Sequence, residues 1–245
     1  MGDKFKGVDT NSRIPTSSYY RLDLHNILPD VDRILYMDGD TAVFQDLSEL
    51  ITLDMEDNYI LGFLDNLPYS LRKFKIKNAV VLCAGVLLID LNALRINNIS
   101  EKYNEFIEKH MGNIYQHDQT IINVICQGKI GTLPPIYGIW NFRNVKQFKY
   151  HNNVQLPWLR YNKKECLISY YYPAIVHYVF GKPYPKHDNK FYFNEWWEYA
   201  KKTGYYGAIY NYSNFHNMLR TMHIYQIMKI YYILANFIKM SYFII

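Results

Sequence analysis

The sequence predicts an α/β fold in which a mostly parallel, Rossmann-like sheet is flanked by helices. Short apolar runs typical of buried strands alternate along the chain with segments of helical spacing. One such run, 34–37, stops abruptly at Asp38-Gly39-Asp40, as expected of a strand that ends at the edge of an open sheet where ligands bind. With 245 residues, 49% of them hydrophobic, the chain can bury the core of one such domain.

The predicted elements follow one another in a regular order. Hydroxyl side chains at 16–18 offer N-caps to a helix that Pro29 ends, and small residues at 83–85 predict a kink that allows close backbone approach. The remaining boundaries rest on apolar spacing. The expected strands are 34–37, 59–64, 79–91 and 174–178, and the expected helices are 16–28, 47–53, 100–110, 118–126 and 194–203.

The cysteines and the first residues indicate a cytoplasmic protein. Cys83, Cys126 and Cys166 are odd in number and form no CxxC pair, so the sequence supports neither a disulfide framework nor a zinc site. Residues 1–6 contain no apolar stretch of signal-peptide length.

The charge distribution separates a neutral body from a basic, aromatic tail. Residues 1–198 hold 22 basic and 22 acidic side chains, and no Asp or Glu follows Glu198. A nucleic-acid binder would carry its basic patch on the folded domain, so we expect no nucleic-acid partner. We predict a domain over 1–204 and a tail over 205–245 that lies on an anionic membrane surface, the inner face of the cytoplasmic membrane. A core-packing helix, or a marginal spanning segment with snorkelling lysines, is the alternative.

The two carboxylates of Asp38 and Asp40 lie one residue apart after a buried run. Such carboxylates repel each other and lose solvation unless a cation or an array of donors compensates them. A divalent metal that carries a diphosphate would do so. A solvated turn is the plain alternative, because Asp-Gly-Asp is common turn chemistry.

Five segments in order resemble the retaining glycosyltransferases of family 8, which include bacterial lipopolysaccharide galactosyl- and glucosyltransferases and glycogenin. The resemblance covers 12–185 and implies a GT-A fold, a UDP-hexose donor carrying galactose or glucose, and a saccharide or lipid-linked glycan as acceptor. It also implies that the family's first βαβ elements are missing from this chain. The segments are TSSYYRL (16–22), LPDVDRILYMDGD (28–40), AGVLLIDL (84–91), HDQ (117–119) and HYVFGKPY (177–184).

The resemblance assigns a metal site and a donor site. Asp38 and Asp40 match the DxD pair that binds Mn²⁺, or alternatively Mg²⁺, with the diphosphate, and His177 matches the third ligand. An imidazole beside carboxylates suits such an ion. Arg21, Gly181 and Lys182 match donor-binding positions, with Lys182 near the departing diphosphate. A structural histidine, a surface arginine and a solvated loop lysine are the alternatives.

The resemblance also assigns the sugar-binding and catalytic positions. Asp118 and Gln119 match the motif at the anomeric centre, and Asp65 matches a sugar-binding residue. An amide oxygen is a poor nucleophile, so we expect same-face attack by the acceptor, with Gln119 positioning and Asp118 orienting the sugar. A helix cap and a turn residue are the alternatives for the two acids. Cys83 replaces a common Asn or Ser, which predicts weaker sugar contacts there.

These features together predict a metal-dependent retaining hexosyltransferase of the kind found in lipopolysaccharide biosynthesis. The alternative is an inactive fragment that binds saccharide or membrane without turnover. A two-metal phosphoesterase would need a denser cluster of carboxylates and histidines than the sequence offers.

Overall fold

The structure, a computed structural model, describes residues 5, 16–65, 74, 80–110, 114, 116–140, 161, 163–179 and 192–221. The chain forms two compact units, Met1–Val179 and Phe180–Ile245. The first unit contains both sheets that the described residues form.

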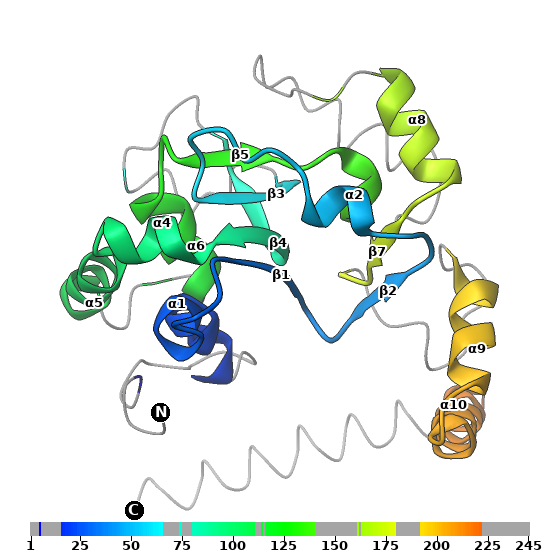
Figure 1. The fold of residues 1–245 in the computed structure, drawn as a ribbon. Helices are drawn as coiled ribbons and strands as arrows, with labels where there is room; N and C mark the ends of the chain where they lie inside the picture. Colours follow the sequence, from blue (N-terminus) through cyan, green and yellow to red (C-terminus); the bar gives the residue numbers. More distant parts are fainter. Residues whose placement is uncertain are drawn as a thin grey trace, which may run out of the picture. The chain divides into compact units, whose positions relative to one another are not determined.

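The larger sheet has four strands, in the spatial order β1 (Arg33–Met37), β4 (Leu82–Asp90), β3 (Ile60–Leu64) and β5 (Ile130–Thr132) (Figure 1). The α/β prediction is confirmed, but the strand directions differ from the predicted mostly parallel pairing. β4 runs antiparallel to both β1 and β3, and within this sheet only the β3–β5 pair of the described strands is parallel. A continuous apolar run indicates that a strand is buried on both faces. It does not indicate whether the strand runs parallel or antiparallel to its neighbours.

Both faces of β4 are buried, which accounts for its nearly continuous apolar sequence. Leu87 and Ile89 belong to one hydrophobic cluster, while Val86 and Leu88 belong to another on the opposite face, as the two-residue period of a strand requires. The pairing with β3 shifts register between Gly62, opposite Leu87, and Leu64, opposite Leu82. The kink predicted at 83–85 therefore lies in the irregular part of β4.

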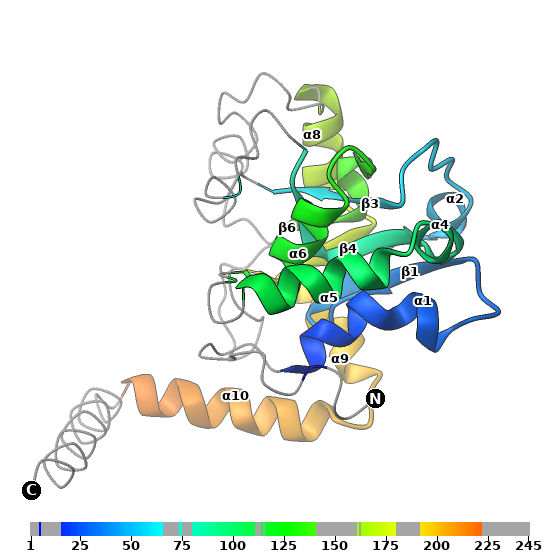
Figure 2. The same cartoon turned by 90° about the vertical axis from the view of Figure 1, so that its left-hand side faces the viewer.

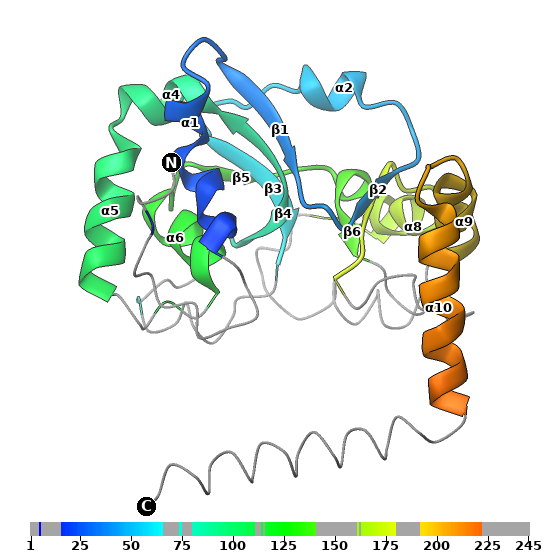
Figure 3. The same cartoon turned by 90° about the horizontal axis from the view of Figure 1, so that it is seen from below.

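Helices cover the two faces of this sheet (Figures 2 and 3). On one side, residues of the first cluster come from η1 (Thr16–Asp23), α4 (Leu91–Ile96), α5 (Ile99–His110) and α6 (His117–Ile125), with α1 (Leu24–Ile27) packed against them. On the other side, α2 (Ser48–Ile51) and η2 (Pro135–Tyr137) contribute to the second cluster. The helix α8 (Lys163–Tyr171) packs against η2.

The smaller sheet has the order β2 (Thr41–Val43), β7 (Ile175–His177) and β6 (Ile139–Trp140). β7 is antiparallel to β2 and parallel to β6. The chain leaves the larger sheet at Met37 and enters the smaller one at Thr41, so the Asp38-Gly39-Asp40 turn joins the two sheets.

The predicted helices are observed with small shifts in their ends. The first is a 3-10 helix over Thr16–Asp23 that continues as α1, and the helix predicted over 47–53 is only α2, whose first residue, Ser48, donates its backbone N–H to Asp46. In the second unit, α9 (Phe193–Lys201) and α10 (Tyr206–Thr221) pack through ring contacts of Trp197 with Tyr206 and Tyr210. Among the described helices, none combines the length and the apolar character that crossing a bilayer requires.

Candidate functional site

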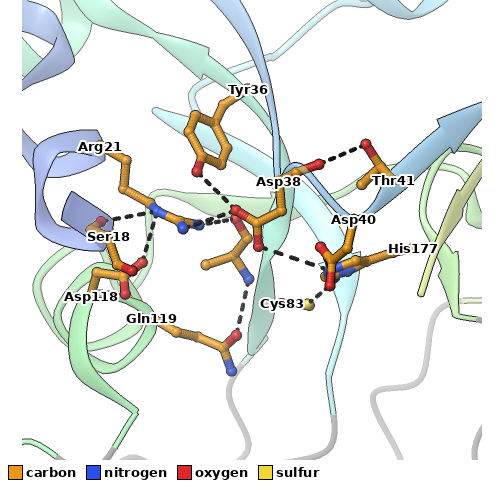
Figure 4. A network of polar contacts seen from close by, with 11 residues as sticks. Ser18, Arg21, Tyr36, Asp38, Asp40, Thr41, Cys83, Asp118, Gln119 and His177 are labelled. Atoms are coloured by element: carbon orange, nitrogen blue, oxygen red, sulfur yellow. Dashed lines mark hydrogen bonds and ion pairs between the residues drawn. The ribbon is translucent and has the colours of Figure 1, made fainter. Parts of the chain in front are cut away.

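Three side chains from the turn and from β7 converge at the junction of the two sheets. Asp38, Asp40 and His177 each offer a ligand atom, and these atoms lie within 4.8 Å of one another. His177 Nε2 is 3.1 Å from Asp40 Oδ1 and 3.8 Å from Asp38 Oδ2 (Figure 4). His177 is buried, whereas both carboxylates are partly exposed. The structure thus brings together the predicted metal ligands.

Backbone pairing places these three residues. The N–H of Asp38 donates to the Gly85 carbonyl at 2.8 Å, which extends the β1–β4 ladder to the first carboxylate. His177 pairs with Thr41 in the β2–β7 ladder, and the N–H of Tyr178 donates to the Asp40 carbonyl at 2.9 Å. The second carboxylate and the imidazole are therefore next to each other because β7 pairs with the strand that follows the turn.

Gly85 provides the space for the imidazole. A Cβ added there would lie 2.0 Å from His177 Cε1 and 2.4 Å from its Nδ1. The small residues 83–85 were predicted to allow close backbone approach, and at Gly85 the group that lies close is the side chain of the candidate ligand His177. Cys83 Sγ lies 3.7 Å from His177 Nδ1, whereas the other ring nitrogen, Nε2, faces Asp40.

Arg21 links the Asp38-Gly39-Asp40 turn to helix α6. Its Nη2 donates to Asp38 Oδ1 at 2.9 Å, its Nη1 donates to the Ala84 carbonyl, and its Nε donates to the Ser18 carbonyl at 3.2 Å. Nε also forms an ion pair with Asp118 Oδ2 at 2.9 Å. The guanidinium is almost fully enclosed, so in this structure it contacts the two acids directly.

Burial and the neighbouring opposite charge shift the pKa values of Arg21 and Asp118 in opposite directions. Burial lowers the pKa of Arg21, but the carboxylates of Asp118 and Asp38 more than offset this, so its pKa is raised overall. Burial raises the pKa of Asp118 to about 6, although Arg21 acts to lower it. Above that pH the Asp118 carboxylate is ionised and balanced by the guanidinium.

Gln119 bridges β4 and the end of β3. Its Oε1 accepts from the Ala84 N–H at 3.0 Å, and its Nε2 donates to Asp65 Oδ2 at 2.8 Å. Asp118 and Gln119 lie in the first turn of α6, as predicted. The structure therefore brings the predicted residues Asp65, Asp118 and Gln119 into one network with Arg21.

Tyr36 belongs to the site, although the sequence analysis did not select it. Its hydroxyl donates to Asp38 Oδ1 at 2.8 Å, and the Arg21 guanidinium lies over its ring, 4.4 Å from the centroid (Figure 4). The sequence contains a sign of this contact: Tyr36 lies two residues before Asp38, and residues i and i+2 of a strand share a face. The predicted donor-binding residues Gly181 and Lys182 lie outside the described residues.

The donor set fits a divalent cation. Carboxylate oxygens and a histidine nitrogen are ligands that Mn²⁺ accepts, and Mg²⁺ prefers the oxygens. The imidazole of His177 lies over Gly85, next to the carboxylates. Arg21 donates to Oδ1 of Asp38. Of the residues present, Asp38, Asp40 and His177 would hold the ion.

Comparison with known proteins finds relatives in sequence and in structure. General stress protein A of Bacillus subtilis is 27% identical over 82% of this chain and 73% of its own length. The glycosyltransferase GlyE of Streptococcus pneumoniae is 27% identical over 69% of this chain, which spans only 37% of GlyE. The structure of the galactosyltransferase LgtC with donor and acceptor sugar analogs superposes with a TM-score of 0.57 at 24% identity, over 76% of this chain and 66% of LgtC. That likeness confirms the GT-A type of fold.

A sequence profile described as "Glycosyl transferase family 8" matches residues 5–186, a range that includes Arg21, the turn, α6 and β7. The match spans most of the first unit and every site residue named above. The chain therefore belongs to glycosyl transferase family 8.

Proposed function

We propose that this protein is a metal-dependent retaining transferase that moves a hexose, galactose or glucose, from a UDP-sugar to a saccharide or lipid-linked glycan, as in lipopolysaccharide biosynthesis. Membership of the family supports glycosyl transfer. The use of a sugar donor and a sugar acceptor is supported by LgtC, whose structure holds donor and acceptor sugar analogs.

The observation that carries the proposal is the convergence of Asp38, Asp40 and His177. Their ligand atoms lie within 4.8 Å of one another although His177 is far from the turn in sequence. Two adjacent carboxylates beside a buried imidazole are best compensated by a cation. Mn²⁺, or Mg²⁺ in its place, would supply positive charge for the diphosphate of the donor.

Arg21 and Lys182 are proposed to serve the donor in different ways. Arg21 already donates to Asp38 and pairs with Asp118, so we propose that it acts by fixing the acids that face the donor. Lys182, next to Gly181 in sequence, would bring a positive charge to the departing UDP, where negative charge develops in the transition state.

The contacts of Gln119 support a positioning role. Its Oε1 already accepts from the backbone N–H of Ala84, and its Nε2 holds Asp65. A carboxamide held in this way is poorly placed to attack an anomeric carbon, and its oxygen is a weak nucleophile. We therefore propose that the acceptor hydroxyl attacks on the face that UDP leaves, with Asp65 and Asp118 orienting the sugar.

The basic, aromatic tail is proposed to hold the enzyme at an anionic membrane surface. Exposed tyrosines lie just before α10 (Tyr205) and within it (Tyr210 and Tyr212). The basic residues of the tail sequence are Arg220, Lys229 and Lys239, and the tail contains no Asp or Glu. Aromatic rings and basic side chains favour the interface of anionic lipid. Such a placement would bring the site to a lipid-linked acceptor.

The test is Mn²⁺-dependent hydrolysis or transfer of the hexose of UDP-galactose and UDP-glucose. We expect turnover that a chelator abolishes and excess Mn²⁺ restores, and a loss of at least about 100-fold in Asp38→Ala because a ligand is removed. Asp30→Ala, which removes an exposed acid before β1, is the matched control and should keep full activity. Equal turnover in both variants would contradict the proposal.

The anomer of the product tests the stereochemical part separately. A UDP-α-hexose should give an α-linked product, and a β-linked product would refute same-face attack. Binding of UDP-hexose without turnover in the presence of Mn²⁺ would favour the alternative, an inactive saccharide-binding protein.

A further inference from the structure

We propose that Tyr36 is a positioning residue for the candidate metal site: together with Arg21 it holds one oxygen of Asp38, so that the other oxygen faces His177. This inference rests on the proposed metal dependence. It assigns a role to a side chain that makes no contact with the ion itself.

The strand geometry places the hydroxyl beside the carboxylate. Tyr36 is the fourth residue of β1, and the N–H of Asp38 extends the same ladder to Gly85. Residues two apart in a strand share a face. The Tyr36 hydroxyl therefore reaches Asp38 Oδ1 at 2.8 Å without leaving the strand's own face.

The two oxygens of Asp38 have different partners. Oδ1 accepts from the Tyr36 hydroxyl at 2.8 Å and from Arg21 Nη2 at 2.9 Å. Oδ2 faces His177 Nε2 at 3.8 Å. Two donors on Oδ1 fix the rotation of the carboxylate, and so Oδ2 stays where the candidate ligand atoms of His177 and Asp40 converge.

Arg21 and Tyr36 also contact each other through a cation–π interaction. The guanidinium lies 4.4 Å from the centroid of the Tyr36 ring, a distance at which a cation is attracted to the face of an aromatic ring. A tyrosine hydroxyl carries its proton at neutral pH, so the Tyr36 hydroxyl is available as a donor to Asp38 Oδ1.

Tyr36→Phe removes the hydroxyl and keeps the ring, so it separates the contribution of the hydroxyl from that of the ring. The phenyl ring keeps its face toward Arg21, while Oδ1 of Asp38 loses one of its two donors. Removing a group that orients a metal ligand typically weakens metal binding by about 10- to 100-fold. Because Arg21 still holds Oδ1 in the variant, we expect the lower end of that range.

The experiment measures Mn²⁺ binding by the full chain without a sugar nucleotide, from the electron paramagnetic resonance signal of the free ion. We expect the dissociation constant of Tyr36→Phe to be about 10-fold higher than that of the wild type. Tyr103→Phe, which removes a buried hydroxyl whose contact is Cys126 Sγ in the core, should bind Mn²⁺ as the wild type does. Unchanged or tighter binding in Tyr36→Phe would overturn the inference.

Two further readouts separate positioning from a folding defect. The metal-free unfolding midpoint of Tyr36→Phe should fall no further than that of Tyr103→Phe, while its rise on adding a fixed Mn²⁺ concentration should be smaller than in the wild type. In turnover, the Mn²⁺ concentration for half-maximal rate should rise about 10-fold, with kcat largely restored at saturating Mn²⁺. A kcat that stays low at saturation would overturn the positioning role.

Failure of the inference and failure of the proposed function give different results. Mn²⁺ binding that is equal in the wild type and in Tyr36→Phe refutes the role of Tyr36 and leaves metal dependence intact. A wild type that binds no Mn²⁺ refutes both.

Discussion

Burial and an ion pair shift the pKa of Asp118 in opposite directions. Burial raises its pKa from 3.8 to about 6, even though Arg21 lies 2.9 Å away. Because the folded state binds this proton more tightly than the unfolded chain, stability falls as pH rises between those two values and stays at the lower level above them.

We predict that Asp118→Asn removes this pH dependence. Below about pH 4 the variant and the wild type should have similar free energies of unfolding, and above pH 6 the variant should be more stable by on the order of 3 kcal/mol. Urea unfolding followed by circular dichroism between pH 4 and 8 measures the difference. A wild type that gains stability relative to the variant as pH rises would show that Arg21 outweighs burial.

Gly85 limits the position of the candidate ligand His177. A methyl group there would lie 2.0 Å from the imidazole Cε1, so the ring has to move away from Asp40. We predict that Gly85→Ala weakens Mn²⁺ binding at least about 10-fold, measured by calorimetric titration. The matched control is Gly207→Ala in α10, where a new Cβ meets no atom within 4 Å. Binding by Gly85→Ala as tight as that of the control would mean that His177 is no ligand.

At the scale of elements, helix α6 is attached to β4 by side-chain contacts to the strand's backbone. Asn123 Oδ1 accepts from the Leu82 N–H at 2.7 Å, and its Nδ2 donates to the Leu82 and Gln119 carbonyls, both at 2.8 Å. One turn earlier, Gln119 accepts from the Ala84 N–H. This attachment fixes the distance of Asp118 and Gln119 from the turn that carries Asp38.

We predict that Asn123→Ala destabilises the fold by about 2–3 kcal/mol, because a fully buried side chain is lost and backbone groups of Leu82 stay unpaired. The free energy of unfolding in urea measures it. Asn92→Ala, an exposed position in α4, should change this free energy by less than about 0.5 kcal/mol. Equal effects of the two substitutions would show that the contacts to Leu82 do not hold the helix.

The pattern of apolar residues predicts buried strands, but it predicts neither their direction nor their pairing. The apolar run that forms β4 predicted a buried strand with a kink, and the structure has a buried strand whose pairing with β3 shifts register in that part. The direction of β4 could not be predicted, because residues buried on both faces look the same in either direction. The pairing of β2 with β7, which places His177 beside Asp40, depends on contacts far apart in sequence.

At the scale of the whole molecule, the sequence predicts a neutral body with a basic tail. We expect the full chain to sediment with vesicles that contain phosphatidylserine and to dissociate as salt is raised, because the attraction is screened. Deletion of 216–245 should lower the bound fraction several-fold. Replacing Lys102 and Lys109 of α5 by Gln removes the same kind of charge from the body and should leave binding unchanged. Partitioning that is unaffected by the deletion would refute the tail's role.

The sequence by itself determined the α/β class, the buried strands and the family resemblance, because hydrophobic period and local motifs are properties of neighbouring residues. Through that resemblance it also selected Asp38, Asp40, Asp118, Gln119 and His177, because each lies in a short segment that matches the family. Only the tertiary structure decided how these residues meet: the antiparallel course of β4, the imidazole seated over Gly85, and the hydroxyl of Tyr36 on Asp38. Those contacts arise from the pairing of distant strands, and no local pattern in the chain encodes that pairing.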